Sequence, residues 1–260
     1  MYCRLPGVSI YYEARGRGRP FVMLHGSPSD HTRAMVQVEP AFRSRTGWRR
    51  FYPDLPGHGK SPGATRIRDM DDYLDVVLEF IDDVAADERF ALGGISFGAY
   101  LALAVARRRG PQVAGLMLSV PEVNHSPREE LRDRRFGTPS ILTPRGKGPG
   151  LSEYSEDTQW LEGLPFRDLS VALYRPGSNF RAPTLLLFGR QDAPFRYRTY
   201  WRLLNGFPRA TYAILDSAGH TLWTDRNPLA AALARDWLDR IQDYRPSPSA
   251  SRRARGSTAE

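Results

Sequence analysis

One serine in this chain of 260 residues lies in the pattern Gly94-Ile95-Ser96-Phe97-Gly98, which can support nucleophilic chemistry. Residues 89–93, just before it, are short and largely apolar, as a buried parallel strand would be. Residues 99–106, just after it, are rich in helix formers. A sharp turn between a strand and a helix lifts a serine hydroxyl clear of the sheet edge, and glycines allow that turn to be tight. The pattern therefore predicts a nucleophilic Ser96.

A serine hydroxyl is a weak nucleophile, so it needs a base and a group that orients the base. His220 follows the apolar run 210–215, and the small residues between them predict a loop after a strand. Asp192 follows residues 183–191, which predict a strand and a glycine turn. All three residues come just after the carboxyl ends of predicted strands, where the sites of α/β sheets collect. We therefore expect the serine, the histidine and the aspartate to meet.

Together with two further loops, these motifs resemble the α/β-hydrolase fold family, and the resemblance covers nearly the whole chain. Five motifs in the family's order are far more specific than any one of them alone. The resemblance implies an α/β fold, with a mostly parallel central sheet, helices on both faces and a small helical cap insertion. The motifs are an oxyanion loop His25-Gly26-Ser27-Pro28, a loop Asp54-Leu55-Pro56-Gly57-His58-Gly59-Lys60-Ser61, a nucleophile elbow at 94–98, an acid turn Gly189-Arg190-Gln191-Asp192 and a histidine loop Gly219-His220.

The resemblance also implies a chemistry for these positions. Ser96 Oγ would attack an electrophilic carbonyl while His220 removes its proton, and Asp192 would fix the imidazole tautomer. The backbone N–H groups of Ser27 and Phe97 would stabilise the oxyanion. This mechanism needs no cofactor, and the sequence holds neither an H-E-x-x-H motif nor a cysteine pair, so no cofactor and no metal are expected.

Other acidic residues compete for the role of the acid. Glu122 follows the apolar run 113–120 and occupies a strand-end position where some members of the family place the acid, so it is the alternative to Asp192. Asp216 and Asp225 flank His220 in sequence and are expected to be loop or capping groups.

The other four histidines are expected to have supporting roles. His25 is interpreted as shaping the oxyanion loop, and His58 as supporting its own turn. His31 and His125 are expected to be surface histidines, and their spacing indicates no metal site.

A serine at the elbow also narrows the chemistry. Epoxide hydrolases and haloalkane dehalogenases of this fold are similar in their loops but use aspartate there. Serine indicates acyl transfer on esters, lactones, thioesters, amides or carbon–carbon bonds next to a carbonyl. Because cofactor-free haloperoxidase-like members also use a serine, peroxide chemistry stays open.

Composition and charge fit this interpretation. Charged residues make up 25% and hydrophobic residues 41% of the chain, as in ordinary soluble proteins. No apolar run reaches the roughly 18 residues of a membrane helix, and the N-terminus lacks the apolar region of a signal peptide. The single cysteine, Cys3, cannot form an internal disulfide. We therefore expect a cytoplasmic protein with no membrane partner.

The net charge of +8 raises the question of nucleic-acid binding. Of this charge, +3 belongs to residues 245–260, which are rich in Pro, Ser, Ala and Arg and are predicted to be disordered. The sequence holds no basic groove interleaved with aromatic residues and no nucleic-acid-binding module, so no specific nucleic-acid partner is expected. The expected partner is a small-molecule substrate, and the oligomeric state stays open.

Strand and helix patterns alternate along most of the chain, which predicts a mostly parallel sheet covered on both faces. Apolar spacing predicts a helix over 69–86, and Asn227-Pro228 is interpreted as the cap and first turn of a helix through Asp243. Residues 124–181 break the alternation and resemble a short cap. The predicted division is an α/β-hydrolase domain at 1–244, with its core at 1–123 and 182–244 and its cap at about 124–181, and a disordered basic tail at 245–260.

The sequence therefore predicts a serine hydrolase that acts on a small carbonyl substrate. The alternative is a non-hydrolytic protein of the same fold, such as an acyltransferase, a cyclase, a cofactor-free haloperoxidase or a ligand-binding protein in a biosynthetic pathway.

Overall fold

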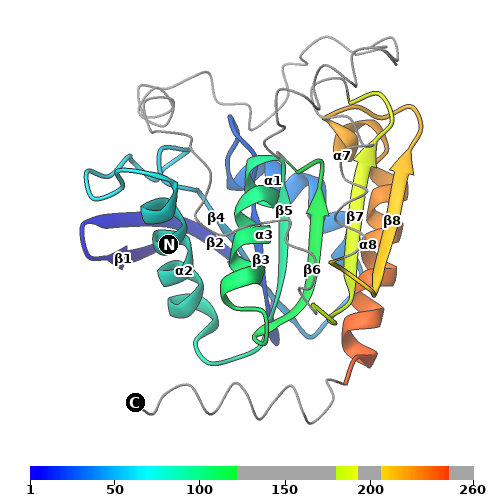
Figure 1. The fold of residues 1–260 in the computed structure, drawn as a ribbon, viewed down its shortest axis with the longest axis horizontal. Coiled ribbons are helices and arrows are strands. Elements are labelled where there is room, and N and C mark those ends of the chain that lie inside the picture. The colour runs from blue at the N-terminus through cyan, green and yellow to red at the C-terminus, as the bar shows by residue number, and fades with distance from the viewer. Residues whose placement is uncertain (122–179, 193–205, 246–260) are drawn as a thin grey trace.

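The computed structural model describes residues 1–121, 180–192 and 206–245, and in them all strands belong to one sheet (Figure 1). The strand order is β1-β2-β4-β3-β5-β6-β7-β8. β2 pairs antiparallel with β1 and β4, and the remaining neighbours are parallel. This confirms the predicted fold class. The strands are β1 (Tyr2–Leu5), β2 (Val8–Arg15), β3 (Arg19–Leu24), β4 (Trp48–Pro53), β5 (Phe90–Ile95), β6 (Val113–Ser119), β7 (Thr184–Gly189) and β8 (Ala210–Leu215).

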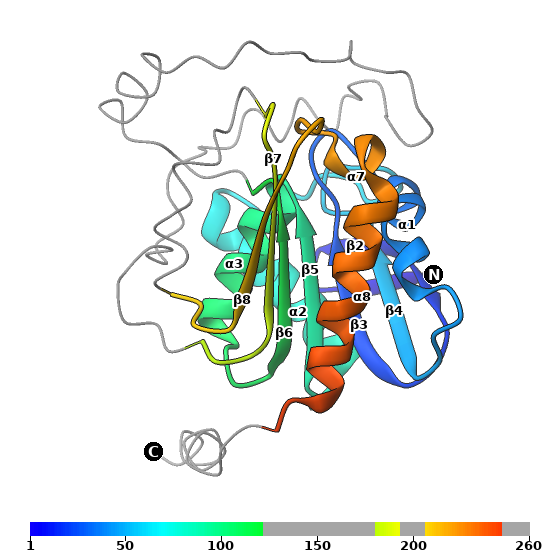
Figure 2. The same ribbon diagram turned by 90° about the vertical axis from the view of Figure 1, so that its right-hand side faces the viewer.

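Helices cover both faces of this sheet (Figure 2). α2 and α3 pack on one face, and α1, α7, α8 and the short 3₁₀ helix η1 pack on the other. Every residue of β5 and β7 is buried, as expected for parallel strands enclosed on both sides. The helices are α1 (His31–Val38), η1 (Glu39–Phe42), α2 (Met70–Ala85), α3 (Phe97–Arg108), α7 (Leu222–Asp225) and α8 (Asn227–Asp243).

The helix predicted over 69–86 is present as α2, and its start has a local cause. The Asp69 carboxylate accepts a hydrogen bond from the Asp72 N–H at 2.9 Å and so caps the helix. Asp71 and Asp72 add negative charge in the first turn, where the helix dipole favours it.

The start of α8 differs from the prediction. Arg226 occupies the N-cap position, and the Asn227 side chain makes no capping bond. Instead, Asn227 Nδ2 donates to the Gln37 carbonyl at 2.9 Å and ties α8 to α1. The interpretation of Asn227 as a cap is therefore wrong, because Asn227 is the first residue of the helix and its side chain donates to a carbonyl of α1.

The register of the parallel strands sets where the candidate residues lie. Leu24 at the end of β3 lies beside Gly94 near the end of β5, and Gly189 at the end of β7 lies beside Leu215 at the end of β8. The loops that follow β3, β5, β7 and β8 therefore leave the sheet from the same edge.

Almost all of the predicted cap at 124–181 lies in 122–179, and almost all of the predicted tail at 245–260 lies in 246–260. Both of these ranges are outside the described residues. The predicted domain division therefore stays a prediction. Within the described part of the chain, the helices are too short or too polar to cross a membrane.

Candidate active site

Ser96 lies on a sharp turn between β5 and α3. Its φ of 52° and ψ of −117° are unusual for a residue with a Cβ, and such a conformation typically costs about 1–3 kcal/mol. The turn is held because the Ser96 N–H donates to the Ser119 carbonyl at 2.9 Å and its own carbonyl accepts from the Tyr100 N–H at 3.0 Å. A Cβ on Gly98 would lie 2.3 Å from the Leu24 carbonyl oxygen, so glycine is required for α3 to begin this close to β3.

The His220 imidazole connects Ser96 to Asp192. Its Nε2 lies 2.8 Å from Ser96 Oγ, and its Nδ1 lies 3.0 Å from Asp192 Oδ2. The carboxylate can only accept, so Nδ1 carries a hydrogen, and in the neutral tautomer that this fixes Nε2 accepts from the serine hydroxyl. Ser96 and Asp192 are buried, whereas about a third of the His220 side chain is exposed. The structure thus brings together the three residues that the sequence singled out.

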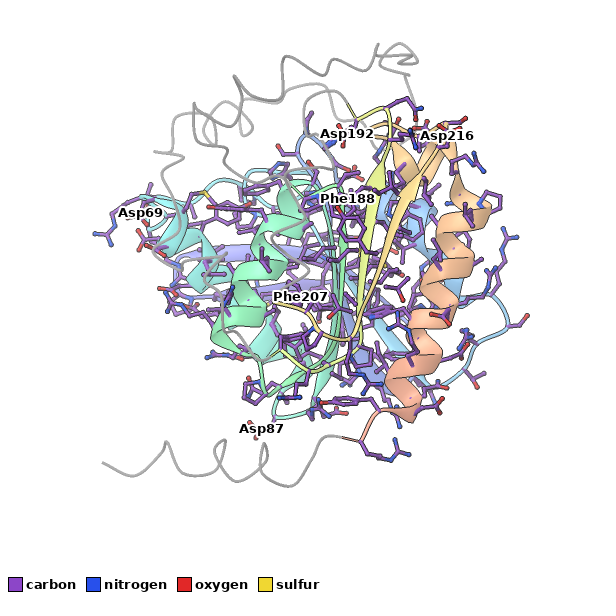
Figure 3. The ribbon with its side chains drawn as sticks, turned by 45° about the vertical axis from the view of Figure 1, so that its right-hand side comes forward. Asp69, Asp87, Phe188, Asp192, Phe207 and Asp216 are labelled. Atoms are coloured by element: carbon purple, nitrogen blue, oxygen red, sulfur yellow. The ribbon has the colours of Figure 1, made fainter. Side chains whose placement is uncertain are left out.

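The acid turn and the histidine loop are held to each other above β7 and β8. Gln191 makes three of these contacts: its N–H donates to the Ala218 carbonyl at 2.9 Å, its Oε1 accepts from the Ala218 N–H at 3.1 Å, and its Nε2 donates to Asp216 Oδ1 at 2.9 Å. Figure 3 shows Asp192 and Asp216 together at this end of the sheet. The bond from Gln191 is the main cause that lowers the pKa of Asp216.

Asp225 holds the histidine loop from the other side. Its Oδ2 accepts from the Gly219 N–H at 3.0 Å, and its carboxylate also accepts from the Thr221 hydroxyl at 3.1 Å. Asp225 therefore fixes the residues on each side of His220. This agrees with its expected role as a loop group.

The loop after β3 packs directly against the serine turn. A Cβ on Gly26 would lie 3.2 Å from the Ser96 Cβ, which places the next residue, Ser27, at the edge of the site. Phe97 is the first residue of α3, and helix geometry aims the N–H groups of a first turn out of the N-terminal end. Of the two residues proposed as oxyanion donors, Phe97 thus directly follows Ser96, and Ser27 directly follows the glycine that packs against Ser96.

Three buried histidines connect the loop after β3 to the loop after β4. The Leu55 N–H donates to His25 Nε2 at 2.9 Å, so His25 Nδ1 carries the hydrogen and donates to the Gly26 carbonyl at 2.6 Å. Burial, and secondarily the nearby His58, lowers the pKa of His25 well below its ordinary value. His25 is therefore neutral and shapes the oxyanion loop, as the sequence indicated.

The expectation that His31 is a surface histidine is wrong. Its side chain is buried, and its backbone N–H and Nδ1 both donate to Asp54 Oδ1 at 2.7 Å. Asp54 itself is fully buried, and its Oδ2 accepts from the Lys60 N–H at 2.9 Å. His31 is buried because it is the first residue of α1, and this end of α1 packs against the loop that carries Asp54. The two residues are 23 positions apart in the chain.

His58 supports its own turn, as expected, but it also reaches the oxyanion loop. Its Nδ1 lies 3.1 Å from the Pro56 carbonyl, and its Nε2 lies 2.9 Å from Ser27 Oγ. The contact with Ser27 had no signal in the sequence, and neither did the bonds of Gln191, because each depends on how two loops meet.

Several remaining candidates lie away from the site or outside the described residues. Glu122, the alternative acid, and His125 are both outside them. Burial and the neighbouring Asp83 raise the pKa of the Cys3 thiol to about 12, so this thiol is unlike a reactive cysteine, whose pKa is lowered. Among the described residues, no group of three or more His, Cys, Asp or Glu side chains is arranged to hold a metal ion.

Comparisons with known proteins place the chain in a family. The model of the alpha/beta hydrolase family matches residues 21–245. The AB hydrolase superfamily protein YisY of Bacillus subtilis is 26% identical over 243 residues, which are 82% of this chain and 89% of the relative. Haloalkane dehalogenase 2 of Mycobacterium bovis is 28% identical over 264 residues, covering 86% of this chain and 90% of the relative.

A solved structure agrees with this placement. The crystal structure of an alpha/beta superfamily hydrolase from Oenococcus oeni superposes with a TM-score of 0.74 at 23% identity, over 91% of this chain and 97% of the other. The motifs, the sheet order and the family match over residues 21–245 agree, and this chain belongs to the alpha/beta hydrolase family.

Proposed function

We propose that this protein is a serine hydrolase that cleaves a small-molecule ester, lactone, thioester or carbon–carbon bond next to a carbonyl. One observation carries the proposal. A continuous hydrogen-bonded chain runs from Ser96 Oγ to His220 Nε2 at 2.8 Å and from His220 Nδ1 to Asp192 Oδ2 at 3.0 Å. This is the geometry in which an imidazole can take a proton from a serine while a carboxylate holds the correct tautomer.

In the first half of the reaction, Ser96 Oγ forms a bond to the carbonyl carbon while its proton moves to His220 Nε2. The negative charge that develops on the carbonyl oxygen is stabilised by the backbone N–H groups of Ser27 and Phe97, each typically worth about 3 kcal/mol of the barrier. The bond to the leaving group then breaks, and the imidazolium returns its proton to that group. Asp192 stabilises the imidazolium throughout.

In the second half, water replaces the leaving group. His220 removes a proton from the water as the water oxygen attacks the acyl carbon, and then donates it to Ser96 Oγ as the acyl bond breaks. The products are a carboxylic acid and a restored serine. A substrate alcohol or amine in place of water would give acyl transfer instead.

The likeness to a haloalkane dehalogenase does not extend to the reaction that we propose. Dehalogenases of this fold use an aspartate at the elbow, and here that position is Ser96. A neutral hydroxyl that is activated by His220 suits addition to a carbonyl. We therefore propose acyl chemistry rather than displacement of a halide.

The proposal is tested with a fluorophosphonate probe and intact-protein mass spectrometry. In wild-type protein, the Ser96 oxygen is expected to bond to phosphorus as fluoride leaves, and the serine proton passes to His220. One adduct per chain is expected, on Ser96. Ser96→Ala and His220→Ala are expected to remove it, because the first lacks the oxygen and the second lacks the base.

Substitution of the serine in a triad typically lowers kcat by about 10⁶-fold. Hydrolysis of p-nitrophenyl acetate should fall accordingly in Ser96→Ala. A folded wild-type protein that takes no adduct and cleaves no aryl ester would contradict the proposal. Labelling with transfer of the acyl group to an added alcohol, but little hydrolysis, would instead support the acyltransferase alternative.

A further inference from the structure

His58 lies between the two residues that carry the proposed oxyanion donors. It comes from the loop after β4, yet its Nε2 is 2.9 Å from Ser27 Oγ in the loop after β3. Its ring is also nearly parallel to the ring of Phe97, with centroids 6.4 Å apart and an interplanar angle of 28°. One buried side chain thus contacts residues from two separate elements that must act together.

The direction of the bond to Ser27 follows from the other contacts of the ring. Nδ1 faces the Pro56 carbonyl at 3.1 Å, and a carbonyl only accepts, so Nδ1 carries the hydrogen. Burial lowers the pKa of His58, against smaller raising effects from hydrogen bonds with the backbone of Pro56 and Leu55 and from Asp54 and Asp30, and the ring is therefore neutral. Nε2 then has no hydrogen and accepts from the Ser27 hydroxyl.

The ring has little freedom to move. His58 is 1% exposed, and His25 packs edge-on against it with centroids 5.0 Å apart. Phe97 is held in turn by the edge of Tyr73, with centroids 5.5 Å apart. Ser27, by contrast, is exposed. Its bond to a fixed ring is therefore an anchor for a residue that solvent would otherwise leave loosely placed.

We infer that His58 is a positioning residue for the oxyanion hole. It fixes the Ser27 backbone through the Ser27 hydroxyl, and it packs against Phe97. Both backbone N–H groups are thereby kept pointing at the developing oxyanion. This inference rests on the proposed function. The Ser27 hydroxyl is oriented toward His58 and serves the reaction through the backbone that it anchors.

Preorganised donors lower the barrier because they need no rearrangement as charge develops, and removal of one costs about 10²- to 10³-fold in rate. Loosening one donor should cost less than removing it. We therefore expect about a 10- to 100-fold loss in the rate of the chemical step, with KM little changed, because the oxyanion forms after substrate binds.

The experiment separates the two contacts of the ring. His58→Phe keeps an aromatic ring against Phe97 but removes the acceptor for Ser27. His58→Gln keeps a hydrogen-bond acceptor without the ring. Ser27→Ala removes the hydroxyl from an exposed position and leaves the backbone N–H, so it tests the anchor even if His58→Phe does not fold. The readouts are the second-order rate of fluorophosphonate labelling, kcat and KM for p-nitrophenyl acetate, and the melting temperature.

Ser61→Ala is the matched control. Ser61 lies in the same loop and is equally buried, but its hydroxyl accepts from the Tyr11 N–H at 2.8 Å, away from Ser27. This variant should lower the melting temperature and leave the labelling rate within about twofold of wild type, because Ser61 contacts neither proposed oxyanion donor.

The expected result is a 10- to 100-fold slower labelling in both His58→Phe and Ser27→Ala, a double variant no slower than the slower single variant, and substantial recovery in His58→Gln. Non-additivity of this kind shows that two residues act as one unit. Unchanged labelling in His58→Phe or Ser27→Ala, or losses that multiply in the double variant, would overturn the inference. If wild-type protein is not labelled at Ser96, the proposed function fails instead.

Discussion

At the scale of single residues, the notable feature of Asp192 is that its carboxylate is buried. The residue is 4% exposed, its Oδ2 faces His220, and its Oδ1 is buried without a hydrogen-bond partner among the described residues. A carboxylate that has given up this much hydration gains strongly from a neighbouring positive charge. In the mechanism that we propose, His220 becomes that charge when it takes the serine proton, so the burial of Asp192 would favour the protonated state of His220.

We expect Asp192→Asn to lower kcat by about 10⁴-fold, as loss of the tautomer-fixing carboxylate does in other triads. The fold should persist, because Asn has nearly the same shape. The measurement is kcat for p-nitrophenyl acetate beside a thermal melt. Asp236→Asn, a change of an exposed carboxylate on α8, is the matched control. A loss of less than tenfold would contradict the role of Asp192 and direct attention to Glu122 through Glu122→Gln.

At the scale of elements, two loops must be held in one geometry, because Asp192 follows β7 and His220 follows β8. The strands pair over their whole length, and the Arg190 N–H continues this pairing by donating to the Leu215 carbonyl at 2.9 Å. Beyond that point, Gln191 replaces the strand ladder with its own backbone and side-chain bonds. The separation of Asp192 and His220 thus depends on Gln191, the chain neighbour of Asp192, whose side chain bonds Ala218 and Asp216 rather than either of the two.

Gln191→Ala is expected to lower kcat by about 5- to 50-fold with little change in KM, since small misplacements of catalytic groups cost up to about 10²-fold. The pKa of Asp216 should rise toward its ordinary value, because the Gln191 bond is the main cause that lowers it. Steady-state kinetics and an NMR titration measure the two effects. Gln112→Ala, just before β6, is the control. An unchanged kcat together with a shifted Asp216 pKa would show that the hydrogen bonds of the Gln191 side chain do not matter for the chemistry.

The elements also show which features the sequence could reveal. α2 was predictable because its apolar spacing and its Asp69 cap are local, and β5, β7 and β8 because each is an apolar run next to turn residues. The pairing of β1 with β2 was not predicted. The two strands meet through a turn at Gly7, which has a φ of 70°, and β1 becomes a strand by pairing with β2.

In the candidate site, too, some features could be predicted from local sequence patterns and others could not. Ser96, Asp192 and His220 were identified because each follows a recognisable strand, and their meeting follows from parallel register. Other features depend on pairs of loops that lie far apart in the sequence. These are the burial of His31 and the contacts of His58 and Gln191. No local pattern encodes such a contact, because either partner alone is compatible with a surface position.

At the scale of the whole molecule, buried neutral imidazoles lie beside the residues proposed as oxyanion donors. His25 and His58 are each 1% exposed, and burial is the main cause that lowers the pKa of both. Hydrogen bonds with the backbone of Pro56 and Leu55, and then Asp54 and Asp30, oppose the effect at His58, whereas the neighbouring ring of His58 adds to it at His25. The fold therefore holds two groups that readily take a proton once the chain unfolds and resist doing so while it is folded.

This difference predicts how stability depends on pH. Above the ordinary histidine pKa of 6.5, both states are neutral at these positions and pH has no effect through them. Below it, the unfolded chain binds protons that the folded chain does not, so the free energy of unfolding falls as pH is lowered. The limiting slope is about 1.4 kcal/mol per pH unit for each group.

Urea unfolding between pH 8 and pH 5 measures this dependence, with His25→Gln as the diagnostic variant. At pH 8 the variant should be less stable than wild type by about 1–3 kcal/mol, because the Leu55 N–H loses a well-placed acceptor. As pH falls below 6.5 the gap should narrow, since the variant has lost one of the two groups that penalise the folded state in acid. A gap that stays constant down to pH 5 would mean that His25 takes up its proton in the folded protein as readily as in the unfolded chain, contrary to the burial that the structure shows.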